Sequence, residues 1–195
     1  DVLGSRGLGD VYKRQVVYLS TDVETGVVKS VTKNAETIAS MFGLEDEVKE
    51  KTAGFDERIE ALAEKAKGHT ALVGMTTSGS FNLMGNDGRC SIIGVEIGFD
   101  NLTAAESTST HGNEASFETV VEKNPEYIFV MDRDQAIGAD GAQTAKEIME
   151  NELVMQTDAY KNGKIIYLEH PAVWYTAEGG ITALDVMLSD LEESL

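Results

Sequence analysis

Two arginines stand where they could hold an anionic ligand. Outside residues 1–15 the chain has three arginines, Arg58, Arg89 and Arg133. Arg133 follows an apolar run with one residue between them, and Arg89 directly follows a glycine-containing turn, so both come after predicted strands. A guanidinium group keeps its charge and donates several hydrogen bonds in a fixed fork, which suits an anion. In the alternative interpretation, Arg133 pairs with a carboxylate and only ties its loop.

Arg133 lies between two acidic residues, Asp132 and Asp134. If the preceding strand continues through them, successive side chains point to opposite faces of the sheet. Both carboxylates would then point away from the face that Arg133 uses. The nearness of the two aspartates in sequence therefore does not by itself mean that they neutralise Arg133.

Three other side chains could contact a ligand. His111 lies in the polar stretch STSTHGNEAS, where a lone histidine is usually a solvated surface residue. Trp174 and Tyr175 lie in PAVWYTAEGG, directly after the predicted strand 164–168. Two aromatic side chains in that position could line a pocket, or they could cap the core, which is the commoner arrangement.

The sequence carries no familiar enzyme signature. It lacks GxSxG, GxxxxGK[ST], HExxH and CxxC. The spacing of His69, His111 and His170 is not typical of a zinc site. A hydrolase that uses Ser107 or Ser109 with His111 has neither a nucleophile elbow nor an oriented base in its favour. The sequence therefore favours a protein that is not an enzyme.

Composition limits the classes of partner. The formal net charge is −18, which repels nucleic acid and anionic membrane surfaces. The single cysteine, Cys90, excludes an internal disulfide bond. No run of 18 apolar residues exists, so we expect no transmembrane helix, and no signal peptide is visible. At 195 residues and 42% apolar content, one ordinary domain or two small ones can form.

The first 15 residues differ in character from the rest. DVLGSRGLGDVYKRQ has no amphipathic period and does not begin with Met. It resembles the translated adapter sequence that ends some metagenomic reading frames. We expect residues 1–15 to be a non-native leader and the natural chain to continue upstream. A disordered N-terminal tail is the alternative.

The remaining pattern predicts an α/β domain. Residues 16–19 are predicted to form a short buried strand, and residues 28–68 carry helical spacing, with a plausible break at Gly43. Charged residues on the opposite face of this tract, including Arg58, are typical of a solvated helix surface. Further strands are predicted at 71–75, 81–84, 127–131 and 164–168. Further helices are predicted at 92–99, 116–123, 144–150, 154–160 and 182–195. This alternation indicates a mainly parallel sheet, whose ligands bind beyond the carboxyl ends of the strands.

Several stretches together resemble one known family. They are THG at 110–112, NPEYIFVMDR at 124–133, AIG at 136–138, NGKIIYL at 162–168 and WY at 174–175. In order and spacing they resemble the C-terminal part of class III periplasmic binding proteins, which capture ferric siderophores for ABC importers. The similarity is greatest to the group that binds catecholate siderophores of the petrobactin and enterobactin type.

The resemblance implies a domain plan. In this family, two α/β lobes are joined by one long helix and the ligand lies in the cleft between them. Residues 16–27 would be a remnant of the N-terminal lobe. Residues 28–68 would be the long linker helix, and residues 69–195 the C-terminal ligand-binding lobe. That lobe is expected to be a three-layer Rossmann-like domain.

The resemblance also implies a set of ligand contacts. Ferric tris-catecholates are trianions, and the positions that match the family's cleft arginines are Arg89 and Arg133. Some members complete the coordination of Fe(III) with a histidine and a tyrosine, which match His111 and Tyr175. Trp174 precedes that tyrosine and is expected to contact the ligand. The family's aromatic residue near the arginine turn is replaced here around Cys90 and Ser91.

The function implied is the substrate-binding subunit of an iron-siderophore importer. No cofactor would be permanently bound, and the ferric siderophore would be the ligand. The expected partner is an ABC permease, contacted by carboxylates such as Glu114, Glu118 and Glu122. An extracytoplasmic location, in the periplasm or at the cell surface, would follow, with membrane association only through an N-terminal lipid anchor absent from this chain. The same fold could instead bind cobalamin, haem or a metal ion such as zinc.

Overall fold

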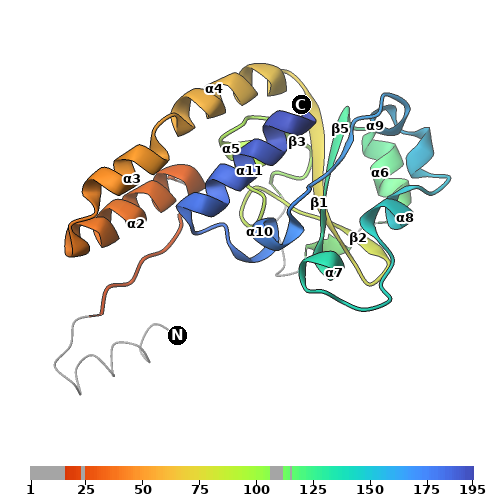
Figure 1. Cartoon of the computed structure of the whole chain (residues 1–195). Helices are drawn as coiled ribbons and strands as arrows, with labels where there is room; N and C mark the ends of the chain where they lie inside the picture. Colours follow the sequence, from red (N-terminus) through yellow and green to blue (C-terminus); the bar gives the residue numbers. More distant parts are fainter. Residues whose placement is uncertain (1–15, 23–24, 106–111, 115) are drawn as a thin grey trace.

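The protein is a three-layer α/β structure (Figure 1). The computed structural model describes residues 16–22, 25–105, 112–114 and 116–195. Its sheet comprises β1 (Thr70–Thr77), β2 (Ser80–Leu83), β3 (Asp100–Asn101), β4 (Asn113–Glu114), β5 (Tyr127–Asp132) and β6 (Ile165–Tyr167). The strand order is β4-β2-β1-β5-β6, with β3 also paired to β1.

The sheet is parallel at its centre and antiparallel at one side. β1 runs parallel to β5 and to β3, and β5 runs parallel to β6. β2 folds back on β1 as an antiparallel hairpin, and β4 pairs antiparallel with β2. The predicted α/β class is confirmed, and the strands predicted from apolar runs at 71–75, 81–84, 127–131 and 164–168 all form.

Alternating side chains of β1 and β5 build two separate cores. Val73, Met75, Phe129 and Met131 face the larger core, which also contains the apolar side of the last helix. Leu72, Ile128 and Val130 face a smaller core on the other side of the sheet. Because successive strand residues point to opposite faces, one apolar run supplies both cores.

Helices cover both faces of the sheet. α5 (Ile92–Val95), α10 (Pro171–Thr176) and α11 (Ile181–Ser194) lie on one side of it, and α6 (Phe117–Lys123), α8 (Ala145–Met149), the 3-10 turn η1 (Val154–Gln156) and α9 (Asp158–Lys161) lie on the other. α7 (Arg133–Ala136) directly follows β5. The predicted cap of α6 is present, because the Ser116 hydroxyl accepts from the backbone N–H of Thr119. Leu184, Met187, Leu188 and Leu191 of α11 are fully buried, as its periodicity predicts.

The expected single linker helix is wrong. Residues 28–68 instead form three helices, α2 (Val27–Phe42), α3 (Glu45–Thr52) and α4 (Phe55–Ala66). Gly43 ends α2 in the left-handed conformation, and Gly54 precedes α4 in the same conformation. A residue with φ near +70° to +90° cannot continue a right-handed helix, so these two glycines break the tract. Figure 1 shows the three helices running along one side of the molecule and extending beyond the sheet.

The predicted strand at residues 16–19 is also wrong. These residues pair with no strand of the described chain, and Val16, Val17 and Tyr18 are about half exposed or more. An apolar run needs neighbouring strands before it can form a buried strand. Leu19 instead borders an apolar cavity of about 460 Å³ between α2, α3 and the start of α11. None of the described helices is long and apolar enough to span a membrane.

Candidate functional site

Two arginines and a tyrosine, far apart in sequence, meet at one point of the structure. Arg133 donates from Nε to the hydroxyl of Tyr175 over 3.1 Å, and Arg89 donates from Nε to the backbone carbonyl of Tyr175 over 2.9 Å. The guanidinium carbons of Arg89 and Arg133 lie 4.7 Å and 5.6 Å from the centre of the Tyr175 ring. Two positive charges therefore lie against one aromatic ring.

The carboxyl end of β5 places Arg133 at this point. β5 ends at Asp132, whose side chain accepts from the backbone N–H groups of Gln135 and Ala145 over 2.9 Å and 2.8 Å. Asp132 thereby starts α7, and Arg133 becomes the first residue of that helical turn. The sequence-based expectation that Arg133 lies beyond the carboxyl end of a parallel strand is met.

The expectation that both flanking aspartates point away from Arg133 is wrong for Asp134. Its carboxylate lies 3.3 Å from Nη1 of Arg133 and also accepts from the backbone N–H of Ser78 over 2.7 Å. The chain turns into α7 after Asp132, so the alternation of an extended strand no longer applies there. The pKa of Arg133 is raised, mainly by its hydrogen bond to Tyr175 and to a smaller extent by the negative charge of Asp134. This guanidinium group therefore stays charged.

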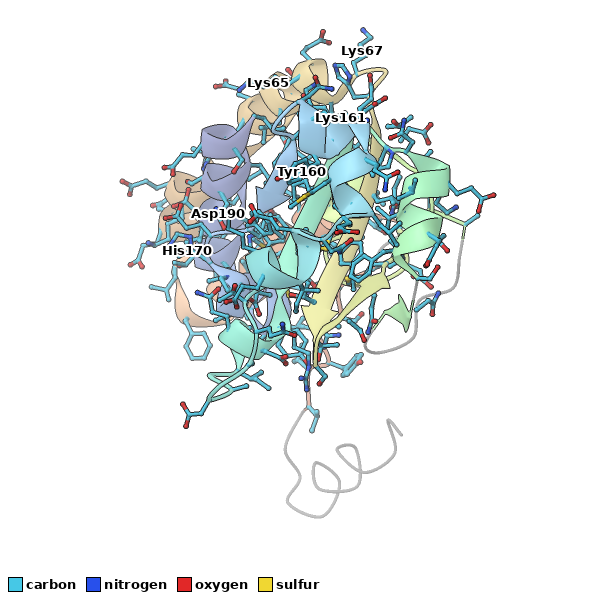
Figure 2. All side chains as sticks on the ribbon, turned by 90° about the vertical axis from the view of Figure 1, so that its right-hand side faces the viewer. Lys65, Lys67, Tyr160, Lys161, His170 and Asp190 are labelled. Atoms are coloured by element: carbon cyan, nitrogen blue, oxygen red, sulfur yellow. The ribbon has the colours of Figure 1, made fainter. Side chains whose placement is uncertain are left out.

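Helix α10 places Tyr175, and a buried carboxylate holds the start of that helix. Asp190 of α11 accepts from the indole Nε1 of Trp174 over 2.8 Å and from the backbone N–H of His170 over 3.2 Å. Nδ1 of His170 lies 2.7 Å from the same carboxylate. Asp190 itself is only 3% exposed. Figure 2 shows His170 and Asp190 side by side at the edge of the molecule.

Trp174 does not supply a ligand-contacting surface in this structure. Its side chain has no exposed area and its single donor is satisfied by Asp190. Of the two possibilities open from the sequence, the structure shows Trp174 in the core, beneath the residue that meets the arginines. The expected ligand contact of Trp174 is corrected accordingly, since a buried indole cannot touch a bound molecule.

Of the three histidines considered for a zinc site, the structure describes two, His69 and His170. His111 lies outside the described residues, as do Ser107 and Ser109. His69 and His170 each contact a different carboxylate, Glu126 and Asp190. Within the residues that the structure describes, no group of three or more His, Cys, Asp or Glu side chains could hold a metal ion.

Sequence reasoning missed the residues that support the site. Thr77, at the end of β1, accepts from Nη1 of Arg133 over 3.3 Å. Glu178 accepts from the backbone N–H of Cys90 over 2.7 Å, next to Arg89. The one signal for Glu178 was an acidic residue in the otherwise uncharged tract PAVWYTAEGG. Cys90 and Ser91 are both 1% exposed, so they offer no surface in place of the aromatic residue expected beside Arg89.

Comparisons with known proteins agree on one family. A family model described as periplasmic binding protein matches residues 13–172. The petrobactin-binding protein YclQ of Bacillus subtilis is 33% identical over 181 residues, which are 92% of this chain and 56% of YclQ. The ferric-anguibactin-binding protein FatB of Vibrio anguillarum is 27% identical over 168 residues, which are 84% of this chain and 51% of FatB.

Solved structures show the same fold. The catecholate-siderophore binding protein VctP of Vibrio cholerae superposes with a TM-score of 0.85 at 27% identity, over 97% of this chain and 68% of VctP. The crystal structure of YclQ superposes with a TM-score of 0.84 at 31% identity, over 97% of this chain and 66% of YclQ. By sequence, the chain spans about half the length of the curated relatives that it matches, YclQ and FatB.

Proposed function

The chain belongs to the periplasmic binding protein family, and from this premise we propose that it captures a ferric catecholate siderophore for an ABC importer. The observation that carries the proposal is the convergence of Arg89 and Arg133 on Tyr175. The names of the relatives support the choice of ligand, since YclQ is a petrobactin-binding protein and VctP a catecholate-siderophore binding protein.

Arg89 and Arg133 would supply the local positive charge that an anionic ligand needs on this acidic protein. A protein with a formal net charge of −18 repels a trianion, so local positive charge must overcome that field. Arginine donates charge-assisted hydrogen bonds and stacks on aromatic rings, and both features suit the oxygens and rings of a catecholate. The side chain of Arg133 is 24% exposed, which leaves part of its surface for a ligand.

Tyr175, together with His111, is proposed to complete the coordination of Fe(III) in a tetradentate siderophore. Iron belongs to the ligand here and is not a resident cofactor. Phenolate oxygen and imidazole nitrogen are both donors that Fe(III) accepts. The guanidinium groups of Arg89 and Arg133, which lie beside the Tyr175 ring, would place positive charge next to the anionic complex. Trp174 would support Tyr175 from the core.

The surroundings of the protein follow from the same proposal. The described residues would form one wall of the binding site, with further contacts from the part of the relatives that this chain does not span. The partner would be an ABC permease, and Glu118 and Glu122, exposed on α6, are candidate contacts alongside Glu114. The location would be extracytoplasmic, as a periplasmic protein or a lipid-anchored one, and binding would involve no chemical reaction.

The test is a titration with ferric catecholate complexes, followed by the fluorescence of Trp174. This is the only tryptophan of the chain, and it is adjacent to Tyr175. We expect saturable quenching, because energy passes from the indole to the coloured iron complex. Arg133→Ala should weaken binding by roughly tenfold or more, the usual effect of losing a charge-assisted hydrogen bond.

Arg58→Ala is the matched control for Arg133→Ala. Arg58 of α4 pairs with Asp185 and Glu192 of α11, whereas Tyr175 lies on α10, so the loss of Arg58 should leave the affinity unchanged. The titration is repeated on the chain extended to the length of its relatives. Absence of quenching in both forms, or equal affinities for wild type and Arg133→Ala, would contradict the proposal.

A further inference from the structure

The turn that carries Arg89 is attached to the end of α10 by two hydrogen bonds. Arg89 donates from Nε to the carbonyl of Tyr175, and the next residue, Cys90, donates its backbone N–H to Oε1 of Glu178 over 2.7 Å. Glu178 lies just beyond α10, which ends at Thr176. The position of Arg89 therefore depends on contacts at both sides of the peptide bond between Arg89 and Cys90.

The backbone of this turn needs such support. Cys90 has a φ of 61°, in the left-handed region that residues other than glycine adopt rarely and at a cost. Its side chain is nevertheless buried, at 1% exposure. A strained conformation persists only where neighbouring contacts hold it. The carboxylate of Glu178, accepting a short hydrogen bond from the strained residue, is such a contact.

Glu178 also lies among charges of both signs. Arg89 stabilises its ionised form, and the hydrogen bond from Cys90 does the same, whereas Glu96 of the segment after α5 repels it. Oε1 of Glu96 accepts from the backbone N–H of Val28, and its Oε2 is buried without a hydrogen-bond partner among the described residues. The thiol of Cys90 has a raised pKa because of burial, so it stays neutral.

We propose that Glu178 is a positioning residue for the anion site, which holds the Arg89 turn on α10 and whose charge state sets how strongly Arg89 holds an anion. The inference rests on the proposed function, because it takes the Arg89 and Arg133 site as the place where an anion binds. Glu178 itself need not touch the ligand.

The sign of the effect follows from the charges. The pKa of Glu178 is raised to about 7, mainly because the carboxyl group is partly buried and also because the charge of Glu96 repels it. At higher pH the ionised carboxylate offsets the charge of Arg89, so an anion is held more weakly. At lower pH the neutral carboxyl group no longer offsets the charge of Arg89, so an anion is held more strongly. An anion bound beside Arg89 also disfavours the ionised form of Glu178, so binding draws a proton from solvent onto this carboxyl group.

The first arm of the test needs no ligand and follows hydrogen exchange of the Cys90 amide. Glu178→Gln keeps an oxygen that accepts this hydrogen bond, Glu178→Ala removes it, and Glu152→Gln at an exposed position is the control. We expect the protection factor to fall by roughly tenfold or more in Glu178→Ala. In wild type, protection should also fall from pH 8 to pH 6, as the carboxylate is neutralised, and Glu178→Gln should show no such change.

The second arm measures, at pH 6 and at pH 8, the affinity of wild type and of Glu178→Gln for the ferric complex of a bis-catecholate. The ratio of the two dissociation constants cancels any change in the ligand itself. We expect wild type and Glu178→Gln to bind about equally at pH 6, and wild type to bind roughly threefold to tenfold more weakly at pH 8.

The two arms separate this inference from the proposed function. A ratio of dissociation constants that stays constant between pH 6 and pH 8 would overturn the inference, even if siderophore binding itself is strong. Unchanged protection of the Cys90 amide in Glu178→Ala would overturn it as well. If no variant binds a ferric catecholate, the proposed function fails, and the exchange arm still decides whether Glu178 holds the turn and responds to pH.

Discussion

Arg133 and Tyr175 are joined by a hydrogen bond of 3.1 Å across 42 residues of sequence. Arg133 comes from the end of β5, and Tyr175 comes from α10 after β6. β5 and β6 are parallel neighbours in the sheet, so the segments that follow them emerge at the same edge. The bond therefore connects α7 and α10 at the edge where α/β sheets bind ligands, and it fixes the directions of a guanidinium group and of a phenol relative to one another.

Tyr175→Phe tests the proposed iron ligand. The variant keeps the ring that both arginines contact but removes the oxygen that accepts from Arg133. We expect a folded protein whose ferric-catecholate complex lacks the visible charge-transfer contribution of a phenolate. The absorption spectrum of the complex with wild type and variant measures this difference.

Tyr160→Phe serves as the control for that spectrum, because Tyr160 lies on α9, on the opposite face of the sheet from α10. Its complex should absorb like that of the wild type. Identical spectra for Tyr175→Phe and wild type would show that Tyr175 does not bind the iron.

Arg58→Ala tests the attachment of α4 to α11. Arg58 donates to both carboxylate oxygens of Glu192 and to Asp185, over 2.6–2.7 Å. Its side chain is 24% exposed and those of its partners are more so, so solvent screens the pairs. We expect a loss of about 1 kcal/mol in the free energy of unfolding, measured by urea denaturation at low salt.

Salt and acid provide the internal controls for Arg58→Ala. The difference from wild type should shrink in molar salt. Arg58 lowers the pKa of Glu192, so the stabilisation is present above the unfolded pKa of that carboxyl group and is lost as the pH falls through the folded one. A difference that is equal at pH 3 and pH 7 would contradict the ion-pair account.

Asp190→Asn tests the anchor of α10. The substitution weakens the acceptor of the fully buried Trp174 indole, so we expect a loss of about 2 kcal/mol in the free energy of unfolding from this bond. It also removes the charge beside His170. The hydrogen bond to Asp190 first, and then its charge, raise the pKa of His170. The contribution of this pair is therefore full below the unfolded pKa of histidine and is lost as pH rises through the folded one.

Denaturation at pH 5.5 and pH 9 measures the consequence for Asp190→Asn. The difference in stability between wild type and variant should be larger at pH 5.5. In a His170→Gln background the same difference should no longer depend on pH. If it still does, the dependence comes from another group and not from the His170–Asp190 pair.

Gly74→Ala tests the packing of the β1–β2 hairpin. A Cβ atom on Gly74 would lie 2.3 Å from Cζ of Phe81 and 2.8 Å from the backbone oxygen of Asn82. Since the backbone cannot move aside cheaply, we expect a loss of about 2 kcal/mol or more in the free energy of unfolding. Gly179→Ala is the control, because nothing lies within 4 Å of its Cβ position. A stability of Gly74→Ala equal to that of Gly179→Ala would contradict this packing.

Local patterns in the sequence predict the regular elements well. Apolar runs predict β1 and β5, and the periodicity of Leu184, Met187, Leu188 and Leu191 predicts the buried face of α11. These patterns succeed because the spacing of apolar residues along the chain reflects whether one face or both faces of an element are buried. The positions of Arg89 and Arg133 after strands are equally local, so half of the candidate site follows from the sequence.

The remainder depends on tertiary contacts or on backbone conformations that the pattern hides. Helix α10 was not predicted, although Pro171 at its first position is a typical start. The break at Gly43 was expected from the sequence, but the helical spacing continued across Gly54, where only the positive φ angle shows that the tract breaks again. The residues that support the site, Glu178 and Asp190, act on partners far away in sequence, which no local pattern reveals.

Because Cys90 is buried, the rate at which its thiol is labelled depends on how often the surrounding turn opens. Its thiol is the only one in the chain, is 1% exposed, and has a pKa raised by burial, so reagents that attack thiolates reach it only when the turn opens. Because Cys90 directly follows Arg89, the rate of labelling reports how often the turn that carries Arg89 detaches from α10. Mass spectrometry of the labelled chain would thus measure the rate at which this turn opens without any residue being substituted.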